Sequence, residues 1–325
     1  MTTPIGIGLI GLGRHGLRYA THLLEGVPGG RLAAVCRRDA AAGEAYAGRH
    51  GLRYYRTPAE LIADPQVGVV IVVTPPALAL PIACEVIRQR KPLLIEKPLA
   101  CRAAEARAIV QAAEEARVPL MVAQTLRFDS AVKAMKEGLA ALGAPRYFTF
   151  TNRVEPRPEV LQDLEGYGGR GVLLEIGVHL LDLIRVLTGE EVAEVRCEMD
   201  RHGSMGPESR AFVTLRTVSG LPCLVDVSRV SGGRVGRAEY VAAEGQLMAD
   251  WVGHRMRRIV SRDQADEWST EPQPTIVSVL TAFLTALDQG TPMPVAGVDG
   301  LRAVEIADAC YASAATGQWT AVSKT

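Results

Sequence analysis

The pattern of apolar and polar positions divides the chain into two regions of different character. Over residues 5–123, short apolar runs alternate with segments whose apolar side chains recur at helical spacing. The runs predicted to be buried strands cover residues 5–10, 32–36, 67–73, 93–95 and 119–123, with a shorter element around Tyr54. Because strands and helices alternate, this region favours a doubly wound parallel sheet of about six strands.

Beyond residue 123, several stretches alternate with period two, which is typical of antiparallel strands with one buried face. They include residues 211–217, 222–227 and 239–243, separated by turn signals such as Ser219-Gly220. Helical spacing returns at residues 129–141, 172–187, 276–287 and 301–315. We therefore predict an α/β domain over 1–123 and a second α/β domain over 124–325, built on a mostly antiparallel open sheet.

The open sheet bears on assembly. A sheet with helices on one face leaves its other face to solvent or to a partner, and the apolar residues of the strands predicted here favour self-association. We expect a homodimer or homotetramer formed through that sheet, which makes the second domain a substrate-binding and oligomerisation domain.

Three glycines stand where the first strand gives way to a helix. Gly11, Gly13 and Gly16 form G-x-G-x-x-G directly after Ile5–Ile10. Such glycines permit a tight turn, a close approach of backbone amides to a pyrophosphate, and close packing of helix on strand. The motif predicts that residues 1–123 form an NAD(P)-binding Rossmann domain. A glycine-rich turn without a ligand is the alternative.

The residues after the second predicted strand bear on which dinucleotide binds. About 20 residues past the glycines, an acidic residue binds the ribose 2′-hydroxyl of NAD, whereas an arginine accommodates the 2′-phosphate of NADP. Arg37 and Arg38 stand at this place, so we favour NADP(H). NAD(H) stays possible, because Asp39 follows immediately and could serve the ribose in a shifted register.

Two later segments carry candidate catalytic side chains. Lys97 follows the strand at 93–95, where an ammonium near the nicotinamide can stabilise a developing alkoxide or take part in proton transfer. Glu175 and His179 are four residues apart on a predicted helix and share a face, so the carboxylate can orient the imidazole as a general base. The structural alternatives are that Lys97 is a surface lysine, that His179 is a core histidine, and that the nearby Asp182 forms an ordinary helix ion pair with Arg185.

Composition excludes several other classes of protein. The 36 Lys and Arg residues balance 36 Asp and Glu residues, so no net field attracts nucleic acid or an anionic membrane. No apolar run has the length of a membrane span, and the start of the chain lacks signal-peptide features. The six cysteines lie in apolar segments and are interpreted as buried thiols. From the lack of a membrane span and of signal-peptide features we expect a cytoplasmic protein. No third ligand stands at metal spacing from Glu175 and His179, so we expect no metal.

Together these motifs resemble the glucose-fructose oxidoreductase/inositol dehydrogenase (Gfo/Idh/MocA) family. The resemblance rests on the glycine motif, Thr74-Pro75, Glu96-Lys97-Pro98, GVLLEIGVHLLDLIRVLTG at 171–189 and PVAGVDGLRAVEIADACYASAATGQW at 294–319. It covers essentially the whole chain. It implies an NAD(P)-dependent oxidoreductase acting on CH–OH groups, which transfers hydride between nicotinamide and a carbinol or keto carbon of a sugar, polyol, inositol or sugar derivative.

The resemblance also implies roles for individual residues. In catalysis, Lys97 would polarise the substrate oxygen, His179 would accept a proton during oxidation, and Glu175 would orient one or both. The residues implied in cofactor binding are Gly11, Gly13, Arg14, His15, Gly16, Arg37, Arg38, Thr74, Pro75, Glu96 and Lys97. The residues expected on the substrate side are Arg127, Arg153, Tyr167 and Arg170, with Arg157 in the same loop. These arginines would suit a carboxylate or phosphate, or could be solvated.

Three positions depart from the family's pattern. Glu175 replaces the commoner aspartate and adds one methylene, and Ala79 stands where many members have a histidine. Arg37 replaces the usual acid, which supports NADP(H).

Two other interpretations stay open. An enzyme that retains its nicotinamide could use transient oxidation to permit elimination or glycosidic cleavage, as some relatives do. A non-catalytic, cofactor-sensing regulator could keep the fold alone. The intact Lys97, Glu175 and His179 argue against the regulator, because a sensor has no need of all three.

Overall fold

The computed structural model describes residues 4–156, 165–201 and 206–323. Contacts between residues divide the chain into two compact units. The first comprises residues 1–124 and 274–301, and the second comprises residues 125–273 and 302–325. Each unit has its own sheet and its own helices.

Residues 274–301, which the sequence pattern places with the second domain, pack in the first unit. Helix α9 (Thr275–Gln289) buries Phe283 and Leu284, and an ideal Cβ on Gly30 would lie 2.8 Å from a methyl carbon of Leu284. Further along, the Val122 amide donates a 3.0 Å hydrogen bond to the carbonyl oxygen of Val295. The segment therefore covers the first sheet although it is distant from that sheet in sequence.

The first unit holds a six-stranded parallel sheet in the order β3-β2-β1-β4-β5-β6. Its strands are β1 (Ile5–Ile10), β2 (Gly30–Cys36), β3 (Arg53–Tyr55), β4 (Val69–Val72), β5 (Leu93–Glu96) and β6 (Leu120–Ala123). This order confirms the predicted Rossmann fold. The direction of strand addition reverses between β1 and β4, and ligands of such sheets bind outside the carboxyl ends of the strands at that point.

The helices of the first unit alternate with these strands. They are α1 (Arg14–Glu25), α2 (Ala40–His50), α3 (Pro58–Ala63), α4 (Ala79–Arg88) and α5 (Ala103–Ala116), with α9 and the short 3-10 turn η1 (Pro76–Leu78). Local signals set their starts. Asp39 accepts a hydrogen bond from the Ala42 amide at the start of α2, and Thr57 with Glu60 forms a capping box on α3.

The second unit holds a nine-stranded sheet in the order β14-β13-β12-β11-β7-β10-β9-β8-β15. Strands β7 and β10 pair in parallel, and the other neighbours in this order pair antiparallel over the described residues. The strands are β7 (Pro145–Arg153), β8 (Val192–Arg201), β9 (Glu208–Thr217), β10 (Pro222–Ser228), β11 (Val235–Ala242), β12 (Gly245–Asp250), β13 (Arg255–Ser261), β14 (Gln264–Ser269) and β15 (Thr320–Ala321). The mostly antiparallel sheet predicted for this region is thereby confirmed.

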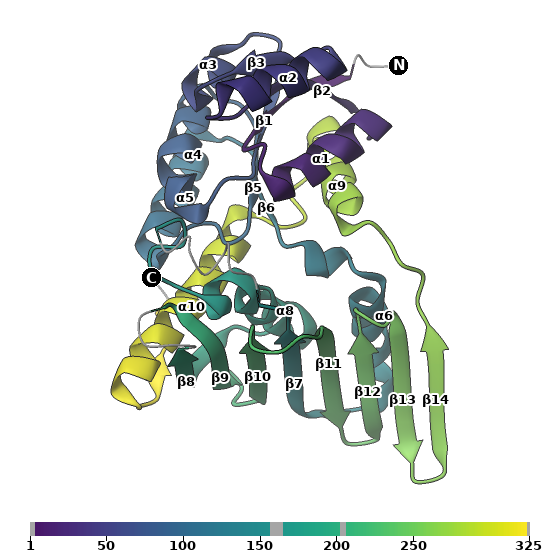
Figure 1. Cartoon of the computed structure of the whole chain (residues 1–325). Coiled ribbons are helices and arrows are strands. Elements are labelled where there is room, and N and C mark those ends of the chain that lie inside the picture. The colour runs from purple at the N-terminus through teal and green to yellow at the C-terminus, as the bar shows by residue number, and fades with distance from the viewer. Residues whose placement is uncertain (1–3, 157–164, 202–205, 324–325) are drawn as a thin grey trace. The chain divides into compact units, whose positions relative to one another are not determined.

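Helices of the second unit pack on one face of this sheet (Figure 1). They are η2 (Thr125–Phe128), α6 (Ser130–Gly138), η3 (Leu139–Leu142), the π-helix η4 (Leu173–Gly177), α8 (Val178–Thr188) and the part of α10 (Gly297–Thr316) beyond residue 301. The single helix predicted over 172–187 is thus a π-helix followed by an α-helix. On the opposite face of the sheet, Phe212 is 42% exposed and Leu224 is 46% exposed.

Among the described residues, no helix combines the length and apolar character needed to cross a membrane.

Candidate active site

Two glycines of the predicted motif are required by the protein's own packing. Gly11 follows β1 with φ of 98°, a conformation that L side chains rarely adopt, and an ideal Cβ there would lie 2.2 Å from the carbonyl oxygen of Val73. On Gly16, in the first turn of α1, an ideal Cβ would lie 1.8 Å from the carbonyl oxygen of Gly11. These two residues hold the turn and the helix against the sheet.

Gly13 is different, because nothing in the protein requires a glycine there. Its φ of −83° and ψ of −171° suit any residue, and an ideal Cβ would meet nothing within 4 Å. It stands directly before α1, whose first amides have no side-chain cap. A helix N-terminus with open space before it accepts a phosphate group, so this loop fits the pyrophosphate of a dinucleotide.

A buried hydroxyl lies at the same edge of the sheet. Thr74 Oγ1, just past the end of β4, has no hydrogen-bond partner among the described residues. An ideal Cβ on Gly11 would lie 3.1 Å from Thr74 Cγ2, which places Thr74 beside the glycine turn, and the exposed Pro75 follows it. A buried polar atom without a partner is expensive unless a ligand or water satisfies it. The donor set therefore fits the predicted cofactor.

Glu96, predicted to bind cofactor, is tied to neighbouring protein groups. Its Oε1 lies 2.9 Å from Nε2 of His15 and accepts a 2.5 Å hydrogen bond from the Tyr19 hydroxyl. Its Oε2 accepts a 3.0 Å hydrogen bond from the backbone amide of Lys97. Burial alone would raise the pKa of Glu96, but the hydrogen bond from His15 and the charges of His15 and Lys97 lower the pKa overall. Glu96 thus connects α1 to the end of β5 and fixes the backbone at Lys97.

The arginines after β2 differ from each other. Nη1 of Arg37 donates a 3.0 Å hydrogen bond to the carbonyl oxygen of Leu12 inside the glycine loop. Arg38 is exposed and has no ion-pair partner among the described residues. Asp39 caps α2 through a 3.1 Å hydrogen bond from the Ala42 amide. Because Arg37 and Arg38 follow the last residue of β2, both lie at the carboxyl edge of the first sheet. The exposed Arg14 and the half-buried Lys97 lie at the same edge.

In the second unit, the two candidate catalytic residues are buried on consecutive helical segments. Glu175 lies in the π-helix and is 7% exposed, and His179 lies in the first turn of α8 and is 9% exposed. Arg229 Nη2 donates a 2.6 Å hydrogen bond to Glu175 Oε2. π-Helical turns inside α-helices are frequent at functional sites.

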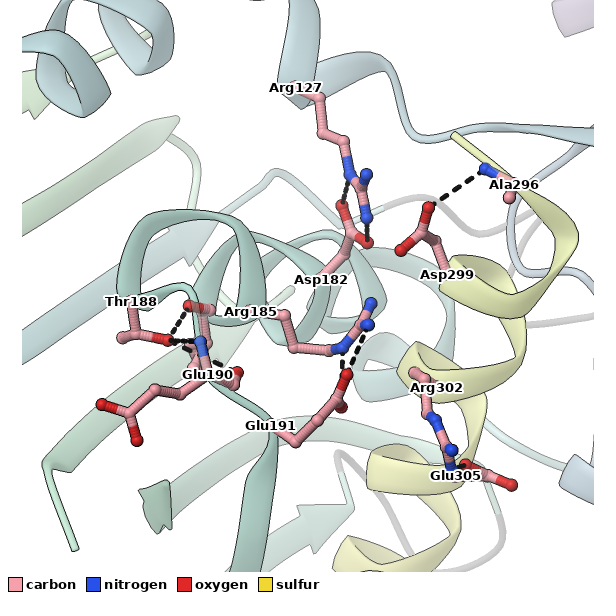
Figure 2. A network of polar contacts seen from close by, with 11 residues as sticks. Arg127, Asp182, Arg185, Thr188, Glu190, Glu191, Ala296, Asp299, Arg302 and Glu305 are labelled. Atoms are coloured by element: carbon pink, nitrogen blue, oxygen red, sulfur yellow. Dashed lines mark hydrogen bonds and ion pairs between the residues drawn. The ribbon is translucent and has the colours of Figure 1, made fainter. Parts of the chain in front are cut away.

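Arg127, expected on the substrate side, makes a bidentate ion pair with Asp182 of α8 (Figure 2). Its Nε donates to Oδ2 at 2.7 Å and its Nη2 donates to Oδ1 at 2.5 Å. Asp182 is 1% exposed, so the pair is shielded from water. Arg127 thereby anchors the turn η2 to helix α8.

The other residues expected on the substrate side also have protein partners. Arg170 pairs with Asp308 of α10, and its guanidinium stacks 4.3 Å from the centre of the Tyr311 ring. Arg153 pairs with Asp226 across β7 and β10, and strand register places both on the open face of the sheet, opposite the helices that carry Glu175 and His179. Tyr167 lies in the same turn as Arg170, and the Arg170 amide donates to its carbonyl oxygen. Arg157 lies outside the described residues.

The sequence pattern did not indicate a role for four residues of these networks. They are Tyr19, Glu208, Arg229 and Asp308. Tyr19 lies on the buried face of α1 and could have been marked by its spacing from the glycines. The other three meet their partners only through the tertiary fold.

The parallel six-stranded sheet and its glycine loop define a dinucleotide-binding protein of the Rossmann class, and comparison with known families identifies an oxidoreductase. Residues 5–124 match the oxidoreductase family with an NAD-binding Rossmann fold, and residues 132–248 match the GFO/IDH/MocA C-terminal domain. The chain belongs to the Gfo/Idh/MocA family of oxidoreductases, as its motifs predict.

Its relatives act on several compounds. A myo-inositol 2-dehydrogenase from Thermotoga maritima is 30% identical over 316 residues, which cover 92% of this chain and 92% of the relative. A D-apiose dehydrogenase from Paraburkholderia graminis is 27% identical over 93% of this chain and 85% of its own. The solved structure of GenD2 from gentamicin A biosynthesis, in complex with NAD, is 27% identical with a TM-score of 0.87, covering 99% of this chain and 97% of that one.

Proposed function

We propose that this chain is a dehydrogenase or reductase that favours NADP(H) and acts on the carbinol or keto carbon of an uncharged polyol, inositol or sugar. The observation that carries the proposal is the carboxyl edge of the first sheet. Gly13, with open space beside it, follows β1, and Lys97, whose backbone amide is bound by Glu96, follows β5 of the same sheet. The relatives named above supply the substrate class.

The proposed chemistry assigns one task to each side chain. When bound, the nicotinamide supplies or accepts the hydride. Lys97 polarises the substrate oxygen with its ammonium, and His179 accepts the hydroxyl proton during oxidation and returns it during reduction. Glu175 provides the fixed negative charge that orients the imidazole.

The preference for NADP(H) is supported by the surroundings of Arg37 and Arg38. Arg37 is held on the glycine loop through Leu12, and Arg38 is exposed beside it. Asp39, the alternative ribose ligand, caps α2 through Oδ1, and its Oδ2 lies 3.9 Å from Nη2 of Arg37. The exposed guanidinium of Arg38 next to the ribose would favour a phosphate over a hydroxyl.

An uncharged substrate is favoured by the pairing of the arginines. The guanidinium groups of Arg127 and Arg170 each contact an acidic side chain. A guanidinium already paired with a carboxylate attracts an anionic substrate less, because its charge and donors are engaged. Neutral hydroxyl-rich compounds suit such a site better than sugar acids or sugar phosphates.

The proposed assembly is a homodimer or homotetramer that covers the open face of the second sheet. Phe212, Leu224 and Tyr147 are between 39% and 46% exposed, and register places all three on that face. Light scattering should give two or four times the mass of one chain, and the mass of a single chain would contradict this assembly. The proposed location is the cytoplasm, which suits six cysteines present as thiols.

The experiment that tests the function follows absorbance at 340 nm with NADP⁺ or NAD⁺ and a panel of substrates. The panel pairs neutral compounds such as myo-inositol and D-apiose with matched phosphorylated and carboxylated sugars. Turnover of a neutral compound with NADP⁺ is the expected result. Turnover of the charged compounds alone would overturn the proposed substrate class, and no turnover in either direction would overturn the proposed function.

A further inference from the structure

Arg229 directly follows β10 (Pro222–Ser228), the strand that contacts the π-helix carrying Glu175. Its backbone amide donates a 2.8 Å hydrogen bond to the carbonyl oxygen of Ser209 on β9, which fixes its main chain to the sheet. Nη2 donates to Glu175 at 2.6 Å, and Nη1 donates to the carbonyl oxygen of Glu155 at 3.0 Å. Its guanidinium therefore has a defined place.

The pair of Arg229 and Glu175 is shielded from solvent. Their side chains are 2% and 9% exposed, respectively. Both line a cavity of about 10 Å³, large enough for about one water molecule, together with Arg170 and Glu208. A charge pair in such surroundings is weakly screened, and removing one member leaves the other in a low-dielectric site.

The π-helix explains why the carboxylate meets this arginine. Glu175 lies within Leu173–Gly177, where the hydrogen bonds run from residue i to i+5, and His179 lies just beyond in α8. The wider turn rotates side chains before the junction relative to those after it. Glu175 also has one methylene more than aspartate. From this turn the Glu175 carboxylate accepts the 2.6 Å hydrogen bond from Arg229.

The start of this helix is held independently of Arg229. The Glu208 carboxylate accepts hydrogen bonds from the amides of Gly171 at 2.8 Å and Leu173 at 3.0 Å. The hydroxyl of Tyr311 donates to the same carboxylate at 2.6 Å. Because Glu208 anchors the backbone, loss of Arg229 should release the side chain of Glu175 without unwinding the helix.

We infer that Arg229 is a positioning residue for the proposed reaction: it fixes the Glu175 carboxylate, and through it the charge that His179 experiences. The inference rests on the proposed function for its catalytic consequence. Its structural part, a fixed carboxylate acting on the imidazole, can be measured without turnover.

The first test is spectroscopic. The chain has six histidines, so selective ¹⁵N labelling gives few imidazole signals, and His179→Gln identifies the signal of interest. Arg229→Met should move the His179 signal, because the Glu175 carboxylate is then neither held nor neutralised, and Glu175→Gln shows separately the shift that loss of the carboxylate charge produces. The control is Arg258→Met, which removes an exposed ion pair to Asp266 and should leave the signal in place. A His179 signal that is unchanged in Arg229→Met would overturn the inference.

The second test is kinetic, with the neutral compound that the wild type turns over fastest. Arg229→Met should lower kcat by about 10²-fold and leave the KM values within about 3-fold, because a small displacement of a catalytic group mainly lowers the rate. Arg229→Lys, which restores the charge, should recover part of the loss. In the Glu175→Gln background, Arg229→Met should cost nothing further. A near-normal kcat in Arg229→Met, or additive losses in the double variant, would overturn the inference.

The two tests separate the inference from the proposed function. If the wild type is inactive on every compound but the His179 signal moves in Arg229→Met, the proposed function fails and the positioning role stands. If the wild type is active and the signal does not move, the positioning role fails alone. Should Arg229→Met not fold, Arg229→Lys takes its place, and it must then move the His179 signal by a smaller amount in the same direction.

Discussion

The carboxyl edge of the first sheet and the helix of the second unit hold their polar groups in opposite ways. At the sheet edge, Gly13 leaves open space, Thr74 Oγ1 has no partner in the described chain, and Arg38 is exposed. On the helix, Glu175 and Asp182 are each bound by a buried or half-buried arginine. Polar groups without a partner in the protein indicate where a ligand binds. Carboxylates paired with buried arginines indicate side chains whose positions the protein fixes.

The largest expected effect follows from removing a proposed reacting group, either Lys97 at the sheet edge or His179 on the helix. Lys97→Ala and His179→Ala should each lower kcat by about 10³-fold or more, because general acid–base and oxyanion contributions are lost. Cofactor affinity, measured by fluorescence titration, should stay within about 3-fold. The exposed Lys136→Ala serves as the control. A rate near that of the wild type in either variant would remove that residue from the mechanism.

Gly13→Asp should separate cofactor binding from folding. Aspartate is a good N-cap, and its negative charge interacts favourably with the helix dipole. The free energy of unfolding should therefore stay within about 1 kcal/mol of the wild type. Its charge should weaken NADPH binding by about 100-fold, or about 2.7 kcal/mol. The matched variant Gly16→Ala, where a Cβ would clash with the Gly11 carbonyl, should instead destabilise the fold. Unchanged NADPH affinity in Gly13→Asp would show that no pyrophosphate lies there.

Arg127→Met tests whether the arginine of Figure 2 is structural. The variant leaves the buried Asp182 carboxylate without its bidentate partner, which should cost about 3 kcal/mol of unfolding free energy in urea. Arg258→Met, which breaks an exposed pair with Asp266, should cost less than about 1 kcal/mol. If Arg127→Met were as stable as the wild type and raised only the substrate KM, Arg127 would belong to the substrate site.

Arg38→Ala should weaken NADPH binding by about tenfold, or about 1.4 kcal/mol, and leave NADH binding unchanged. The reason is that an exposed guanidinium beside the ribose interacts with the 2′-phosphate alone. Parallel fluorescence titrations measure both affinities. Equal affinities of the wild type for NADPH and NADH would move the ribose contact to Asp39 or to the backbone.

The smallest expected effect is the pH dependence that Glu96 contributes. Its pKa is lowered in the folded protein from the ordinary 4.5, so its ionised form stabilises the fold above pH 4.5. This contribution is lost as the pH falls from 4.5 through the folded pKa. Glu96→Gln should therefore show a flatter decline of unfolding free energy below pH 4.5 than the wild type. Urea titrations at several acidic pH values measure the difference, and parallel declines would contradict it.

The part of the molecule that local pattern determines could be predicted from sequence. The apolar run at 67–73 contains β4 (Val69–Val72), and the glycines follow β1 where the motif requires them. Both depend on residues a few positions apart. The alternation of apolar residues likewise indicated the mostly antiparallel second sheet, because period two reflects one buried face.

What could not be predicted depends on residues that only the fold brings together. Arg229 and Glu175 are 54 positions apart, and Arg127 and Asp182 are 55 apart. No local spacing marks such pairs, so the acid at 175 was expected to serve Lys97 or His179 and its ion pair with Arg229 was missed. The π-helix left no signal in the periodicity. Residues 274–301 were placed by sequence order, whereas burial of Phe283 and Leu284 places them with the first sheet.

The most direct test of the central claim follows the hydrogen itself. The enzyme is incubated with NADP⁺ and the best neutral substrate, deuterated at every carbon-bound hydrogen. The reduced cofactor is then isolated, and its deuterium content is measured by mass spectrometry. One deuterium on the reduced nicotinamide for each keto product formed is the result expected of a reversible dehydrogenase. Product formation without deuterium in the recovered cofactor would contradict that account.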